Sequence, residues 1–225
     1  MGTFELVAIF DLDGTLVDSV EQISRNLNEA RIEFGFPAKP QEFYEALIGL
    51  PVHDLLSDLT TTPLVLNELV THFRKLLVLD IQKGNIAIYP GVIELFQLLE
   101  GMHIQLAIAT SKPTNIALEV IRCSALSSFN VHIQGTDGFP PKPDPAVIRR
   151  VLANFEYKKA FMVGDRVEDV IAAHRAGISS IGIAASTHTE VDLKMAGAWQ
   201  TFNSFEEFYF AVRGDLSLMR KVPIV

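Results

Sequence analysis

Short apolar runs alternate along most of the chain with segments in which apolar residues recur at helical spacing. The runs at residues 7–10, 104–109, 160–163 and 180–184 are mostly apolar and end at polar residues, and residues 131–134 predict a further short strand. Apolar runs bounded in this way are typical of buried strands in a parallel sheet. The segments between them predict amphipathic helices over residues 92–99, 115–122, 146–155 and 169–176.

Strands that alternate with amphipathic helices indicate right-handed crossover connections between parallel strands. We therefore predict an α/β fold with a Rossmann-like parallel sheet core and helices on both of its faces. The chain contains no internal repeat or low-complexity segment that would favour another architecture.

The pattern changes between about residues 19 and 84, where helical spacing continues without a strand signal. Ile23, Leu27, Ala30 and Phe34 recur on one helical face, and further helical patterns cover residues 42–48, 52–59 and 64–82. This block predicts an inserted all-helical domain. We place the core domain at residues 1–17 and 88–225 and the helical domain at 18–87. The junctions at 16–19 and 84–90 are candidate hinges.

Composition and charge narrow the class of protein. Hydrophobic residues make up 48% of the 225 residues, which supports a sizeable core, and the formal net charge is −8. The negative charge and the lack of a basic run argue against nucleic-acid binding. We find no signal-peptide pattern and no apolar window long enough to span a membrane. The single cysteine, Cys123, excludes an internal disulfide framework. We expect a soluble cytoplasmic protein without a nucleic-acid or membrane partner.

Candidate chemistry begins where the first strand ends, at Asp11 and Asp13. Ligands of open α/β sheets bind beyond the carboxyl ends of the strands, and side chains two positions apart on an extended chain point the same way. Two close carboxylates repel each other unless a cation or a proton lies between them, so the pair indicates a site for Mg²⁺. The alternative is that these residues only form a turn or cap a helix.

Three further polar clusters lie later in the chain, two at the ends of predicted strands and one in a loop. Thr110-Ser111-Lys112 ends the predicted strand 104–109 and can either bind an oxyanion or cap the next helix. Lys142 lies in a proline-rich loop, residues 140–145, which stiffens the chain around one ammonium group. Asp165 and Asp169 follow the strand 160–163, where helix capping is the alternative to metal binding.

The four clusters together resemble the motifs of the haloacid dehalogenase-like superfamily of phosphohydrolases, in particular its phosphoglycolate phosphatase-like branch. The resemblance runs from Phe10 to about Ala184. It is carried by Asp11-Leu12-Asp13-Gly14-Thr15, Thr110-Ser111-Lys112, Lys142-Pro143-Asp144-Pro145 and the segment from Gly164-Asp165 to Asp169.

The resemblance implies a role for each motif residue. Asp11 would be the nucleophile that forms an aspartyl-phosphate, and Asp13 would be the general acid and then the general base. Mg²⁺ would be held by Asp11, by the backbone carbonyl of Asp13, and by Asp165 and Asp169. Thr110, Ser111 and Lys142 would bind the phosphoryl group. Ser111 replaces an asparagine that is usual in this branch, and it keeps the ability to form hydrogen bonds.

The resemblance also implies that the helical insert is a mobile cap that closes over the core. The turn at residues 48–53 is similar to the substrate-specificity loop of such caps. Gly49 would allow a close backbone approach, and Arg25 and His53 are candidates for contact with the substrate. The alternative is that His53 and Arg25 are ordinary solvated residues.

The function that this resemblance implies is Mg²⁺-dependent hydrolysis of a small phosphate monoester, either phosphoglycolate-like or a sugar phosphate. A phosphomutase of the β-phosphoglucomutase type and a phospho-accepting regulatory protein are the alternatives. Asp13 and the helical insert argue against a signalling receiver domain, and Asp13 also argues against dehalogenation. The sequence leaves open which ester is the substrate and whether the protein is a monomer or a homodimer.

Overall fold

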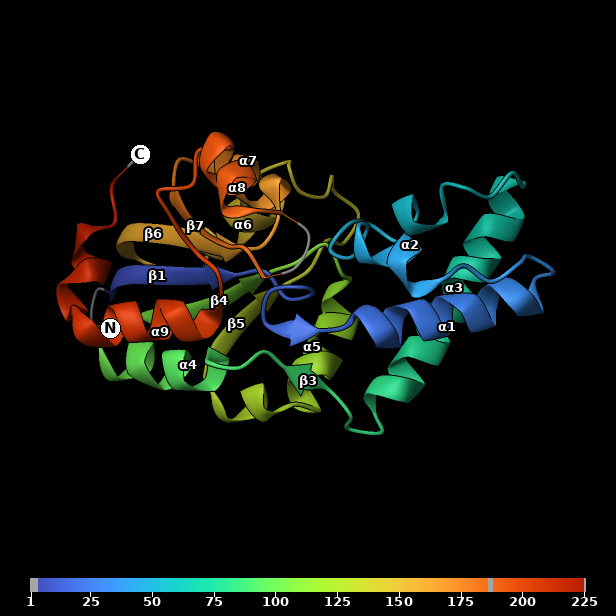
Figure 1. Ribbon diagram of the computed structural model, residues 1–225, viewed down its shortest axis with the longest axis horizontal. Helices are drawn as coiled ribbons and strands as arrows, with labels where there is room; N and C mark the ends of the chain where they lie inside the picture. The colour runs from blue at the N-terminus through green and yellow to red at the C-terminus, as the bar shows by residue number, and fades with distance from the viewer. Residues whose placement is uncertain (1–3, 186–187, 225) are drawn as a thin grey trace.

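The computed structural model describes residues 4–185 and 188–224, and these form two lobes (Figure 1). The larger lobe is built on a six-stranded sheet with the strand order β5-β4-β1-β6-β7-β8, in which every neighbouring pair is parallel. The strands are β1 (Phe4–Phe10), β4 (Gln105–Ala109), β5 (Val131–Gln134), β6 (Tyr157–Gly164), β7 (Ser179–Ile183) and β8 (Gln200–Phe202). The predicted α/β, Rossmann-like parallel sheet is confirmed.

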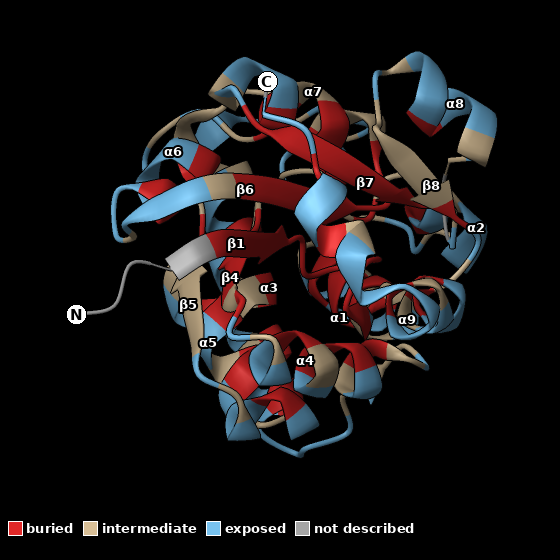
Figure 2. Cartoon of the chain, turned by 90° about the vertical axis from the view of Figure 1, so that its left-hand side faces the viewer, coloured by how far each residue is buried: buried red, intermediate tan, exposed pale blue. Residues whose placement is uncertain are grey.

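Side chains of β1 alternate between two hydrophobic clusters, one on each face of the sheet. Ala8 and Phe10 belong to the first cluster, whereas Val7 and Ile9 belong to the second. Because successive side chains of a strand point to opposite faces, one continuous apolar run serves both clusters. Figure 2 shows β7, residues 6–10 of β1 and residues 160–164 of β6 buried between the helices of the two faces.

Helices on both faces cover this sheet. The first face is covered by α4 (Val92–Gly101), α5 (Thr114–Arg122) and α9 (Phe205–Gly214). The second is covered by α6 (Ala146–Leu152) and α7 (Val167–Ala176). α8 (Glu190–Met195) lies next to α7, with Leu193 close to Gly182 of β7. The predicted helix at 146–155 is therefore shorter than expected, and the one at 169–176 begins two residues earlier.

The smaller lobe is helical and lies beyond one end of the sheet (Figure 1). It contains α1 (Val20–Glu33), α2 (Gln41–Glu45), the 3₁₀ turn η1 (Asp54–Leu56) and α3 (Pro63–Ile81). The helical patterns at residues 42–48 and 52–59 predicted longer helices than the structure contains. Gly49 has φ +89°, and Pro51 has no N–H to donate, so the chain between α2 and η1 forms a loop instead.

Two short strands that the sequence did not reveal connect the lobes. β2 (Val17–Asp18) pairs antiparallel with β3 (Ala87–Ile88), with Val17 opposite Ile88. Two-residue strands are too short to show a period of two, so the apolar pattern does not detect them. They hold the two chain crossings between the lobes side by side.

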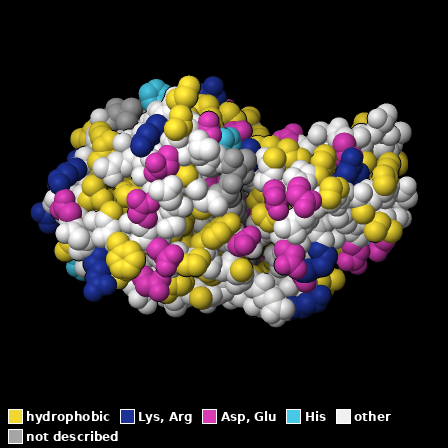
Figure 3. Space-filling view, viewed as in Figure 1, with side chains coloured by type: hydrophobic (Ala, Val, Ile, Leu, Met, Phe, Trp, Pro, Cys, Tyr) yellow, Lys and Arg dark blue, Asp and Glu magenta, His cyan; other side chains and the backbone are white. Residues whose placement is uncertain are grey.

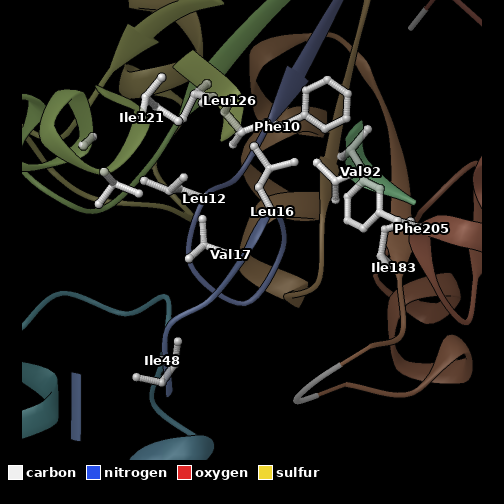
Figure 4. Close-up of a cluster of buried hydrophobic side chains, with 14 of the residues drawn as sticks. Phe10, Leu12, Leu16, Val17, Ile48, Val92, Ile121, Leu126, Ile183 and Phe205 are labelled. Carbon is white, nitrogen blue, oxygen red and sulfur yellow. The ribbon is translucent and has the colours of Figure 1, made fainter. Parts of the chain in front are cut away.

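The two lobes share one hydrophobic cluster. Ile48, on the loop between α2 and η1, belongs to the same cluster as Leu12, Leu16 and Val17, which follow β1 (Figure 4). All four side chains are at most 3% exposed. The helical lobe is therefore packed against the sheet lobe at the carboxyl end of β1.

The described residues that follow α9 extend the sheet lobe. η3 (Leu216–Lys221) follows α9, and Met219 and Val222 are buried. Lys159 on β6 donates hydrogen bonds from Nζ to the carbonyl oxygens of Arg220 and Val222. The described part of the apolar and basic C-terminal segment, residues 218–224, is thus held on the core; Val225 lies outside the described residues.

On the face shown in Figure 3, acidic and basic side chains are interspersed over both lobes, and the outline narrows between them. Within the part of the chain that the structure describes, no helix combines the length and apolar character that a membrane span requires.

An ion pair between a buried arginine and a partly exposed aspartate stabilises the helical lobe. Arg31 on α1 is fully buried and donates to both carboxylate oxygens of Asp58, at 2.9 and 2.8 Å. Hydrogen bonds from Arg31 and then from Lys39, against the opposing effect of burial, lower the pKa of Asp58 to about 2.

We predict that Asp58→Asn lowers the free energy of unfolding by about 2 kcal/mol at pH 7, because it leaves the buried guanidinium without its charged partner. The unfolded pKa of aspartate is about 3.9, so the contribution of Asp58 is complete above about pH 4. It is lost as the pH falls through about 2, where the carboxyl is protonated in both states. Urea unfolding of both proteins between pH 2 and 7 measures this difference. Asp54→Asn, at an exposed carboxylate of the same lobe, is the control, and an equal effect of both substitutions would contradict the prediction.

Candidate active site

The strand register brings the polar clusters to one edge of the sheet. Phe10 on β1 lies opposite Ile108 on β4 and opposite Val163 on β6. Asp11 therefore follows β1 at the level where the neighbouring strands reach Ala109 and Gly164, next to the Thr110 and Asp165 clusters. The chain runs from β1 to β4 on one side and later returns to β6 on the other. Sites of open α/β sheets form at this kind of switch point.

Lys142 lies among the carboxylates at this edge. Its Nζ is 2.6 Å from Oδ1 of Asp11 and 2.5 Å from Oδ1 of Asp169, and it also donates to the carbonyl oxygen of Ala109 at 3.1 Å. Burial alone would lower the pKa of Lys142, but Asp11 and Asp169 raise it above its usual value. The ammonium group therefore stays charged between two buried acids.

Three buried carboxylates surround one small space. Oxygens of Asp11, Asp165 and Asp169 all lie within 4.8 Å of one another. Burial raises the pKa of Asp11 well above its usual value; Lys142 opposes this rise, while Asp169 and Asp165 add to it. A cluster of like charges of this kind is stabilised by a further cation.

The residues at this cluster fit Mg²⁺. All three candidate ligands supply carboxylate oxygens, which are the donors that Mg²⁺ prefers. Oδ2 of Asp11 is buried and has no hydrogen-bond partner among the described residues, so it leaves one oxygen available for a ligand. Unpaired buried carboxylate oxygens are costly, and a bound cation would remove that cost.

The turn after β1 positions one of these acids. Thr15 Oγ1 donates to Oδ1 of Asp165 at 2.5 Å and accepts the Asp165 N–H at 3.1 Å. Gly14 has φ +82°, and a Cβ atom there would lie 2.9 Å from Oδ2 of Asp165. Both residues of the Gly14-Thr15 pair are therefore needed for the close approach of Asp165 to the turn.

A second ion pair involves the proposed general acid. Nζ of Lys112 lies 3.1 Å from Oδ1 of Asp13, and both side chains are less than 10% exposed. Lys112 also donates its backbone N–H to Thr110 Oγ1 at 3.2 Å. Lys112 belongs to the Thr110-Ser111-Lys112 motif, but no role for it was predicted, because nothing in the sequence shows which acid it meets.

A cavity of about 260 Å³ lies between the lobes and touches this edge of the sheet. Asp13 and Ser111 line it from the sheet lobe, and Gly49 and His53 line it from the loop between α2 and η1. Arg25 lies elsewhere: its Nη2 is 2.5 Å from Oδ2 of Asp80, and Nη1 is 3.4 Å from Glu21. The position of Arg25 therefore does not support its predicted contact with the substrate, because its guanidinium is bound to Asp80.

Arg166 joins the two lobes beside the site. Its Nη1 donates to the carbonyl oxygens of Ile48 at 2.9 Å and Ala46 at 3.2 Å, and its Nε lies 3.2 Å from Glu168. A Cβ at Gly49 would approach Arg166 Cδ to 2.7 Å, so glycine gives the side chain room to pass. Arg166 stands between Asp165 and Asp169, and the sequence prediction did not include it, because the two carbonyl oxygens that it binds in the other lobe lie 120 and 118 positions away.

Comparisons with known proteins agree on one family. The model of the family "Haloacid dehalogenase-like hydrolase" matches residues 8–183. A probable phosphatase IndB from Dickeya dadantii (strain 3937) is 32% identical over an alignment of 223 positions, with coverage of 94% of this chain and 95% of that protein. A phosphoglycolate phosphatase from Vibrio vulnificus (strain YJ016) is 30% identical over 185 residues, covering 77% of this chain and 81% of the relative. A solved structure of a predicted phosphoglycolate phosphatase from Haemophilus somnus 129PT shares the fold, with a TM-score of 0.80, 22% identity, and coverage of 94% of this chain and 100% of that one.

Proposed function

The chain belongs to the haloacid dehalogenase-like hydrolase family and is a phosphoric monoester hydrolase, and on this premise we propose that it acts on small phosphate monoesters with Mg²⁺ through an aspartyl-phosphate on Asp11. The observation that carries the proposal is the buried contact of Lys142 with Asp11 and Asp169, with Asp165 within the same cluster. A carboxylate nucleophile, a fixed ammonium and a set of oxygen ligands are the groups that phosphoryl transfer requires.

In the first half of the reaction, an oxygen of Asp11 attacks phosphorus as the bond from phosphorus to the ester oxygen breaks. Asp13 gives a proton to the departing alcohol. Lys142 holds the Asp11 carboxylate in place and offers positive charge to the phosphoryl oxygens. The Thr110 hydroxyl, whose oxygen already accepts the Lys112 N–H, keeps its own hydrogen to donate to the phosphoryl group.

In the second half, Asp13 accepts a proton from water, and the water oxygen attacks the phosphorus of the aspartyl-phosphate. The bond from phosphorus to Asp11 breaks, which restores the Asp11 carboxylate, and inorganic phosphate leaves. Asp13 ends protonated, as it was before the first half. Asp11, Asp165 and Asp169 would hold Mg²⁺ together with the backbone carbonyl of Asp13. The ion, when bound, would neutralise the charge that builds up between carboxylate and phosphate.

We assign the role of a cap domain to residues 18–87. The cavity between the lobes and the hydrogen bonds from Arg166 to the loop at 46–48 support this assignment, because they set cap residues against the catalytic edge of the sheet. A cap that packs over the site keeps bulk water from the reacting groups. Gly49 and His53 remain the candidate substrate contacts on this loop.

Phosphate release from a panel of esters, with Mg²⁺ and with EDTA, tests the proposal. The panel contains phosphoglycolate, sugar phosphates and nucleotides. We expect EDTA to lower the rate for every accepted ester by at least about a hundredfold, and added Mg²⁺ to restore it. Equal rates with and without EDTA would contradict the metal assignment. No release from any ester by the folded, Mg²⁺-loaded protein would contradict the proposed reaction.

A further inference from the structure

The cavity between the lobes extends away from the carboxylate cluster. Of the groups proposed to act on the phosphoryl group, Asp13 and Ser111 line it, whereas Asp11, Lys142 and Asp165 are not among its described lining residues. Asp13 is the proposed proton donor to the leaving alcohol. The cavity beyond it is therefore the space that the leaving alcohol would occupy.

The walls of this space are mainly apolar. The cap contributes Ile23, Leu55, Phe73 and Leu77, and the core contributes Ile116 and Phe139. A small, fully polar alcohol would leave these side chains without contact and would lose hydrogen bonds to water on entering. An apolar body would instead bury its surface against them. The volume of about 260 Å³ is close to the lower limit of about 300 Å³ for small-molecule sites and suits a group the size of one ring.

The charges that line the cavity do not balance. Asp13 and Lys112 form an ion pair at 3.1 Å, which leaves Arg74 on α3 as a second cation. Arg74 is half-buried, and no acid among the described residues lies within ion-pair distance of it. The guanidinium group is a planar donor that binds a carboxylate or a phosphate with two parallel hydrogen bonds. An acidic group on the substrate would supply the missing partner.

We infer that the preferred substrates are phosphate monoesters of alcohols that carry an apolar, ring-sized body and an acidic group that reaches Arg74. This inference rests on the proposed function, since it assigns the leaving group of that reaction. It separates this protein from an enzyme that is selective for two-carbon phosphoglycolate, whose leaving group has no apolar body to fill the cavity.

Four esters of primary alcohols test the apolar part. They are ethyl phosphate, 2-phosphoglycolate, benzyl phosphate and 4-carboxybenzyl phosphate, assayed for kcat/KM with the Mg²⁺-loaded protein. We expect benzyl phosphate to exceed ethyl phosphate by about tenfold or more, because its ring is held by the cavity walls. Equal or better hydrolysis of ethyl phosphate or phosphoglycolate would overturn the inference while leaving the proposed function intact. Failure of all four esters would count against the proposed function itself, and the inference would fall with it.

Substitution of Arg74 tests the acidic part. In the unsubstituted protein we expect 4-carboxybenzyl phosphate to exceed benzyl phosphate by about tenfold. In Arg74→Gln we expect the ratio of kcat/KM for 4-carboxybenzyl phosphate to that for benzyl phosphate to fall to about one. Lys75→Gln, at the next and exposed cation of α3, is the matched control and keeps the preference. An unchanged preference in Arg74→Gln would overturn the assignment of Arg74.

Discussion

Replacement of Asp11 by asparagine is expected to lower kcat for every accepted phosphate ester by about 10⁴-fold or more. The amide has nearly the same size as the carboxylate, but its oxygen is a poor nucleophile, so the aspartyl-phosphate cannot form. Lys142 keeps its contact with Asp169, at 2.5 Å, and therefore still has a charged partner. Phosphate release under saturating Mg²⁺ and ester measures the effect.

The loss should come from chemistry and not from unfolding. Burial raises the pKa of Asp11, so its ionised form is unfavourable in the folded, metal-free protein at neutral pH. Neutral asparagine avoids that cost, and the variant should unfold in EDTA at the same or a higher urea concentration. Asp144→Asn, at a carboxylate of the Lys142 loop that accepts the Ala146 N–H, is the control and should keep its activity. A rate for Asp11→Asn within tenfold of the original would exclude Asp11 as nucleophile.

Replacement of Lys142 by methionine is expected to damage both activity and stability. The substitution keeps an unbranched apolar stem but removes the ammonium that lies within 2.6 Å of Asp11 and Asp169. We expect kcat/KM to fall by about 10³-fold, because one charge that orients the nucleophile and faces the phosphoryl oxygens is lost. In EDTA, the free energy of unfolding should fall by about 3–5 kcal/mol, since removal of one partner leaves buried charge uncompensated.

The dependence of this defect on pH and Mg²⁺ identifies its cause. Lys142 lowers the pKa of Asp11 against the effect of burial. Without Lys142, the pKa of Asp11 in the folded protein therefore rises further above the unfolded value of about 3.9. A raised folded-state pKa stabilises the fold at pH below the unfolded value, and that contribution is lost as the pH rises through the folded value. The defect should therefore be smallest near pH 4 and grow toward pH 7.

Added Mg²⁺ should recover part of the lost stability, because a dication compensates the same carboxylates. Lys194→Met, at an exposed lysine of α8 that is 3.9 Å from Glu190, controls for the loss of a lysine and should change the stability by less than about 0.5 kcal/mol. A defect of Lys142→Met that is independent of both pH and Mg²⁺ would show that packing and not charge is responsible.

The order of apolar and polar residues along the chain was enough to predict the sheet, its two helical faces and the edge at which the polar motifs lie. Apolar runs, helical spacing and strand-end residues such as Asp11 and Asp165 are properties of near neighbours in the chain, and they are readable because secondary structure is periodic. Parallel strands with right-handed crossovers then place their carboxyl ends together. The apolar pattern did not predict β2 and β3, because each is only two residues long. It also did not predict the loop at 46–53, where glycine and proline interrupt the helical spacing of apolar residues.

Which side chains meet at that edge depends on contacts between segments that are far apart in the chain. Lys142 contacts Asp11 across 131 positions of the chain, Lys112 meets Asp13, and Arg166 reaches the backbone of Ile48 in the other lobe. Arg25, by contrast, turns to Asp80 and away from the site. These pairings depend on how two distant segments are placed relative to each other within an ångström or two, which is the range over which hydrogen bonds and ion pairs form. A local pattern carries no information on that scale, so it predicts the edge of the sheet where the chemistry lies but not the partner that each charge finds there.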